Sequence, residues 1–250
     1  MEHHPITWHS LIPGINALPA HTFHALLATV IVIAIAYRAT SQLEKARASG
    51  THLVPDEGLT ARNLAELLVG GIDSMVSGIL SERGKPFLAL FGTFFAFILV
   101  GNVMGLVPGF VPPTSNFNIT FALGLASFLA FTAIGIREQG LGPYLKHFAG
   151  PVWWLAFLIF PIEIVGNLVR PFSLGMRLFG NMTGDHLVLE IFTDLTKLFV
   201  PVVFYFLGAF VSLVQAFVFT LLSIVYMSLA MGHGDGHGHD DEHAAQGHAH

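Results

Sequence analysis

Residues 86–136 read PFLALFGTFFAFILVGNVMGLVPGFVPPTSNFNITFALGLASFLAFTAIGI, and these 51 positions contain no Asp, Glu, Lys or Arg. A helix needs about 20 apolar residues to cross the hydrocarbon of a bilayer, so this stretch predicts two membrane spans. The turn PGFVPPTSNF separates them, at 86–107 and 118–136. A β-barrel would instead show alternating segments of about ten residues. The segment therefore indicates an α-helical membrane protein.

The rest of the 250-residue chain has the same character. It is 53% hydrophobic and only 11% charged, with a mean hydropathy of +0.67, and residues 198–234 again carry no charge. Soluble domains usually contain about twice that share of charged residues. Further spans are predicted at 21–37, 152–196 and 201–231, which makes five in one membrane domain, 1–231. The glycine- and histidine-rich residues 232–250 are predicted to form a disordered tail that requires no metal.

Residues 60–80, TARNLAELLVGGIDSMVSGIL, have a different pattern. Their apolar side chains recur at helical spacing, whereas Arg62, Asn63, Glu66 and Asp73 lie off that face. Such a segment is typical of an amphipathic helix that lies in the membrane interface or against another subunit.

The distribution of basic residues orients the chain. Six of the eleven Lys and Arg residues fall between positions 38 and 85, and two more fall in the loop before residue 150. By the positive-inside rule both loops are cytoplasmic, so the N-terminus is outside and the C-terminus is cytoplasmic. No positively charged leader precedes the first span, so no cleavable signal is expected. The composition offers no cysteine chemistry and no basic surface for nucleic acid.

The stretch at 171–192, PFSLGMRLFGNMTGDHLVLEIF, carries ionisable groups within a predicted span. At about 100° per residue, one stripe holds Glu163, Arg170, Arg177 and Asn181, the opposite side holds His186 and Glu190, and Asp185 lies between them. The axial distance from the first to the last carboxylate is about 40 Å, which exceeds the ~30 Å hydrocarbon core. The helix must therefore tilt or bend, and the last two spans are predicted to form a long tilted hairpin.

Ionisable groups inside a membrane usually serve function. Polar groups that approach from both ends of one helix, with an arginine between them, suit two offset aqueous half-channels separated by a fixed positive charge. Arg177 could instead pair structurally with Asp185 or with a carbonyl, and Arg170 could extend toward the membrane surface. A self-contained secondary transporter with its site around Arg177 and Asp185 is the competing function class, although the inverted repeats that favour it are not evident.

The motifs SLGMRLFGNM (173–182), NVMGLVPG (102–109) with PPTSN after it, and VQAFVFTLLSIVY (214–226) resemble those of subunit a of F-type ATP synthases. The order and number of spans resemble that family from about residue 20 to 231. The resemblance implies a stator subunit of the Fo sector that is not catalytic alone and needs no cofactor. It implies a bacterial inner membrane, with membrane lipid, the c-ring and the peripheral-stalk b subunits as partners and no nucleic acid.

The resemblance also implies roles for individual residues. Arg177 matches the arginine that faces the c-ring carboxylates, Asn181 the asparagine beside it, and Gln215 the glutamine of the last helix. His186 matches the outer half-channel position, and Glu163 matches the acidic residue of the cytoplasmic half-channel.

One position departs from the family pattern. Gly208 stands where many members carry an acidic or histidine partner for the outer-channel residue. The resemblance leaves that partner role to Glu190, Asp185 or water.

Overall fold

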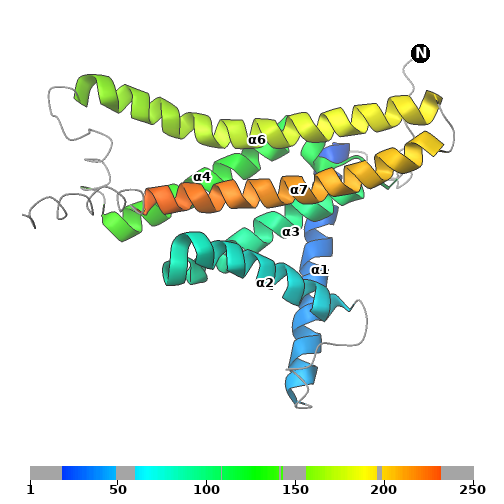
Figure 1. The fold of residues 1–250 in the computed structure, drawn as a ribbon, viewed down its shortest axis with the longest axis horizontal. Helices are drawn as coiled ribbons and strands as arrows, with labels where there is room; N and C mark the ends of the chain where they lie inside the picture. The colour runs from blue at the N-terminus through cyan, green and yellow to red at the C-terminus, as the bar shows by residue number, and fades with distance from the viewer. Residues whose placement is uncertain are drawn as a thin grey trace, which may run out of the picture.

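The computed structural model describes residues 19–48, 60–107, 109–140, 142, 156–195 and 199–231, and every regular element in these ranges is helical (Figure 1). The elements are α1 (Ala20–Ala48), α2 (Ala61–Leu80), the 3-10 helix η2 (Ser81–Phe87), α3 (Leu88–Met104), the 3-10 helix η3 (Pro113–Ser115), α4 (Phe117–Gln139), α6 (Ala156–Leu195) and α7 (Phe199–Ala230). The predicted tail at 232–250 lies outside the described residues.

Five helical stretches in these ranges are long and apolar enough to cross a membrane. They are Ala20–Ala48, Ala61–Met104, Phe117–Gln139, Phe157–Thr193 and Val202–Ala230. This agrees with the predicted all-α membrane class. The second stretch contains α2, η2 and α3, so the interfacial position of α2 remains a prediction.

The first helix is longer than its predicted span. The span was predicted to end at residue 37, where the apolar run stops, but α1 continues to Ala48. Hydropathy marks only the part of a helix that suits hydrocarbon, and the following ATSQLEKARA is rich in good helix formers. Lys45 and Arg47 in the last turn also interact favourably with the negative end of the helix dipole.

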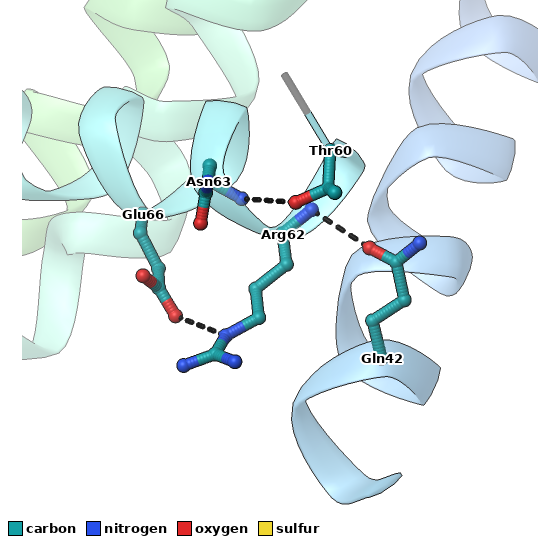
Figure 2. A network of polar contacts seen from close by, with 5 residues as sticks. All are labelled: Gln42, Thr60, Arg62, Asn63 and Glu66. Carbon is teal, nitrogen blue, oxygen red and sulfur yellow. Dashed lines mark hydrogen bonds and ion pairs between the residues drawn. The ribbon is translucent and has the colours of Figure 1, made fainter. Parts of the chain in front are cut away.

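A polar network fastens the start of α2 to α1 (Figure 2). The Thr60 hydroxyl accepts a hydrogen bond from the backbone N–H of Asn63 at 3.2 Å, which caps the helix. The Gln42 side chain on α1 accepts another from the backbone N–H of Arg62 at 2.9 Å. The nearly buried Arg62 side chain donates to Glu66 at 2.7 Å, so its charge is paired within the same helix.

The chain reverses after α2. Ser81, with a φ of 53°, ends the helix in a conformation that non-glycine residues adopt rarely. The short helix η2 follows and leads into α3, and in the view of Figure 1 α3 runs back between α2 and α7.

The last helix, α7, lies at the centre of the packing. One buried cluster joins it to α2, α3 and α4 through residues that include Val76, Phe91, Phe131 and Ile224. A second cluster joins it to α3 and α6. Hydrocarbon outside a membrane protein is as apolar as its core, so close packing and polar contacts, rather than burial from water, hold such helices together.

The tightest crossing joins α4 to α6. A side-chain carbon added to Gly124 would meet the backbone carbonyl oxygen of Pro171, and one added to Gly175 would lie 2.8 Å from the carbonyl oxygen of Thr120. The two glycines therefore let the backbones touch. Aromatic rings of both helices extend the contact, with Phe117 and Phe179 centred 5.8 Å apart.

Candidate functional site

The candidate site lies along α6, which runs beside α7 (Figure 1). Its 40 residues correspond to a length of about 60 Å, and both Pro161 and Pro171 lie inside the helix. Each proline lacks the N–H that would bond the carbonyl four residues earlier, so the ladder is interrupted twice.

Arg177 and Asn181 lie on the exposed face of α6, where the sequence placed them on one stripe. Gly180 and Gly184 share this face, and a side-chain carbon added to either would meet no atom within 4 Å. Within the described part of the chain, the Arg177 guanidinium has no hydrogen bond or ion pair. The alternative in which Arg177 pairs structurally with Asp185 is therefore not formed in the described residues, and the arginine lies on an open surface beside small residues.

Gln215 on α7 contacts the turn of α6 that carries Arg177. Its side chain is nearly buried, with 5% of its surface exposed, and its amide nitrogen donates to the backbone carbonyl oxygen of Arg177 at 3.2 Å. This bond fixes the backbone of Arg177 and leaves its side chain free. The structure thus brings together Arg177 and Gln215, which lie 38 positions apart in sequence.

A cavity of about 240 Å³ lies farther along the pair of helices, toward their connection. It is lined by residues of α3, of the segment after it, of α6 and of α7, among them Asn102, Asp185, His186 and Gly208. Two buried polar atoms at this cavity, an Asp185 carboxylate oxygen and the Asn102 amide nitrogen, have no hydrogen-bond partner in the described residues. The lining of the cavity is mostly apolar, and a space of this size has room for several water molecules.

Gly208 also lines this cavity, and a side-chain carbon added to it would lie 2.8 Å from a methyl carbon of Leu106, so Leu106 packs against the bare backbone of this glycine. Asn102 is a site residue that the sequence analysis did not single out. It is fully buried, and its side-chain oxygen accepts a hydrogen bond from the Thr114 hydroxyl at 2.6 Å, so its side-chain amide group is fixed. An asparagine within an uninterrupted apolar run was the available signal.

The remaining candidates are spread along the helix. Glu190 is exposed, does not line the cavity, and lies one turn beyond His186. Glu163 is half-buried in the first part of α6. Ionisable groups therefore occur near both ends of α6, with Arg177 between them, and the cavity adjoins only the C-terminal set.

Comparison with known proteins identifies the family. The family model described as "ATP synthase A chain" matches residues 22–228. The chain is 43% identical over 226 residues to the ATP synthase subunit a of Bdellovibrio bacteriovorus, covering 90% of this chain and 97% of that protein. It is 49% identical over 166 residues to the ATP synthase subunit a of Geobacter sulfurreducens, covering 66% of this chain and 72% of the relative. The chain therefore belongs to the ATP synthase A chain family, the a subunits of the Fo sector.

Proposed function

We propose that this chain provides two offset half-channels that carry protons to and from the carboxylates of a rotating c-ring, with Arg177 separating them. The outer half-channel leads through the cavity beside Asp185 and His186. A proton that enters there passes to a ring carboxylate, which then moves through lipid as the ring turns. The carboxylate releases its proton on the side of Glu163, and Arg177 attracts the emptied carboxylate before the next cycle.

The observation that carries this proposal is the guanidinium of Arg177, which is exposed on a surface of small residues and has no partner among the residues that the structure describes. An arginine does not deprotonate in proteins, so it holds a fixed positive charge without relaying protons itself. Such a charge in a membrane is costly unless a partner neutralises it. A carboxylate that arrives on the surface of a second, closely packed subunit supplies that partner, and the absent side chains at Gly180 and Gly184 leave room for its approach.

The cavity supports the outer half of the path. Its Asp185 and His186 side chains are half-buried and line the same space, and either can hold a proton. We assign to Asp185 the partner role for His186 that Gly208 cannot fill, because Asp185 lines the cavity and Glu190 does not. Asn181 would help to orient the arriving carboxylate, and Gln215 holds the backbone that carries Arg177.

The finer assignments of place and partners belong to the same proposal. The chain would lie in a bacterial inner membrane as a tilted α6–α7 hairpin, with its N-terminus outside and its C-terminus in the cytoplasm. The helix α2 would lie in the cytoplasmic interface, where the peripheral-stalk b subunits are the proposed contact. Its surface supports this, because Leu64 and Leu67 are exposed apolar side chains on a helix that also carries Glu66.

The test is ATP-driven acidification of inverted membrane vesicles that contain the Arg177→Ala variant of the whole ATP synthase, at matched amounts of assembled complex. We expect pumping to be lost while the complex stays intact. Arg137→Ala is the matched control, since Arg137 is an exposed arginine in the last turn of α4 and lies off the proposed path. Normal pumping by Arg177→Ala would refute the proposal.

A further inference from the structure

A second arginine of α6 makes specific contacts that the sequence did not indicate. Arg170 is half-buried, and its guanidinium donates to the side-chain oxygen of Asn167 at 2.7 Å. Its central carbon lies 5.7 Å from the centre of the Tyr226 ring on α7, which is a cation–π distance. Arg170 is therefore held both within α6 and against α7.

The contact lies beside a break in the hydrogen-bond ladder of α6. Pro171 has no N–H to bond the backbone carbonyl of Asn167, so the helix ladder is broken beside Arg170. Before this turn α6 has little support, because from Phe157 to Gly166 no side chain is buried. Arg170 and Tyr226 therefore join α6 to α7 at the turn that follows the exposed N-terminal part of α6.

This contact bears directly on the orientation of Arg177. The two arginines are seven residues apart, which places them about 10 Å apart along the axis and only about 20° apart around it. Gln215 holds the backbone carbonyl of Arg177, but nothing in the described residues holds its guanidinium. The direction of the Arg177 side chain therefore depends on the rotation of α6 about its own axis.

The geometry makes a small rotation matter. An arginine guanidinium lies roughly 8 Å from the helix axis, the sum of the 2.3 Å Cα radius and the extended side chain, so a rotation of about 20° moves it by roughly 3 Å. That displacement is as large as a hydrogen-bond distance. Two polar contacts to α7, one on each side of Pro171, oppose this rotation together with the buried Leu174 and Leu178.

We propose that Arg170 is a positioning residue: its cation–π contact with Tyr226 fixes the rotation of α6 and thereby places the Arg177 guanidinium for the arriving ring carboxylate. This inference rests on the proposed function of Arg177. Asn167 aids by holding one edge of the Arg170 guanidinium and leaving its face on the Tyr226 ring. The contact needs a cation on α6 and an aromatic ring on α7, and it does not need the tyrosine hydroxyl.

The test uses the whole ATP synthase in inverted vesicles and measures the initial rate of ATP-driven pumping per assembled complex. Tyr226→Leu and Arg170→Met each remove one side of the contact, and we expect either to lower the rate about fivefold, the factor that corresponds to a half-buried cation–π contact. Tyr226→Phe and Arg170→Lys retain a ring and a cation, and we expect them to pump within about twofold of the original chain. Combining Arg170→Met with Tyr226→Leu should lower the rate no further than either change alone.

Arg137→Met is the control for the loss of an arginine elsewhere, and we expect it to pump normally. Normal rates per assembled complex for Tyr226→Leu and Arg170→Met would overturn the inference, even if less complex assembled, because the contact would then be purely structural. Effects of the two changes that multiply in the combined variant would overturn it as well. Arg177→Ala measured in parallel separates the two proposals. If it alone abolishes pumping, the proposed role of Arg177 between the two half-channels stands and only the positioning role of Arg170 fails.

Discussion

The crossing of α4 and α6 predicts that Gly175→Ala destabilises the protein, whereas Gly166→Ala on the same helix does not. The added carbon would lie 2.8 Å from the carbonyl oxygen of Thr120 and 3.1 Å from the Cα atom of Phe121. Both are backbone atoms, so no side chain can turn away. Ordinary contact begins near 3.4 Å, so the two helices must separate by about 0.6 Å.

The size of the effect follows from two opposing contributions. Overpacking of a tight contact costs about 1–3 kcal/mol. Alanine also favours a helix over glycine by about 1 kcal/mol, but that gain is common to every Gly→Ala change within α6. Comparison with Gly166→Ala cancels it, because a carbon added to Gly166 meets no atom within 4 Å. The difference between the two variants therefore isolates the clash, at about 2 kcal/mol.

The measurement is the midpoint temperature at which the chain is lost from the detergent-solubilised ATP synthase during heating. For a protein of this size about 2 kcal/mol corresponds to roughly 4–8 °C, so Gly175→Ala should dissociate that much earlier than Gly166→Ala. Equal midpoints for the two variants would show that α4 and α6 do not touch through their backbones at this position.

Three further predictions concern the site. Asp185→Asn should slow ATP-driven pumping more than Glu190→Gln does, because only Asp185 lines the cavity; equal effects in the vesicle assay would count against that assignment. Thr114→Val removes the donor to the buried Asn102 carbonyl oxygen and should destabilise the chain by about 1–3 kcal/mol, seen as an earlier loss on heating, whereas an unchanged midpoint would mean that water replaces the hydroxyl. Gly180→Ala should not lower the heating midpoint of ring-free protein, because alanine favours a helix and the added carbon meets no atom, yet it should slow pumping because the ring is proposed to pack on this face; an unaltered rate would move the ring contact elsewhere.

Much of the fold could be predicted from the sequence, because crossing a bilayer imposes a length and a composition. The apolar runs predicted five spans, and the helical spacing at 60–80 predicted α2 almost to the residue, Ala61–Leu80. The end of α1 could not be predicted in this way, because a helix can continue beyond the hydrocarbon into water. The crossing at Gly124 and Gly175 could not be predicted either, because the sequence does not distinguish a glycine that contacts another backbone from one that faces lipid.

Candidate site residues could be named from the sequence where a charge interrupts an apolar run, as at Arg177 and Asp185, and their roles stay predictions. Site residues whose contacts depend on the pairing of helices far apart in the sequence could not be predicted. The uniformly apolar α3 gave no indication of which face would carry Asn102 into a cavity, and no spacing rule connects Arg170 with Tyr226, which is 56 positions later. Such contacts depend on the register of two helices, and side-chain patterns on each helix separately do not specify that register.

The contacts between α6 and α7 have a consequence for how this protein adapts to membranes of different thickness. Phe192 stacks on Phe204 with ring centres 4.6 Å apart, Gln215 bonds to Arg177, and Arg170 lies over Tyr226, so the two antiparallel helices are matched at three levels. One residue inserted in either helix between two of these levels would turn everything beyond it by about 100°. Seven residues inserted at the same level in both helices would turn each by only about 20° while lengthening the pair by about 10 Å. Adjustment to a thicker or thinner bilayer therefore has to come from changes in tilt, because the length of this helix pair can change only in coarse steps.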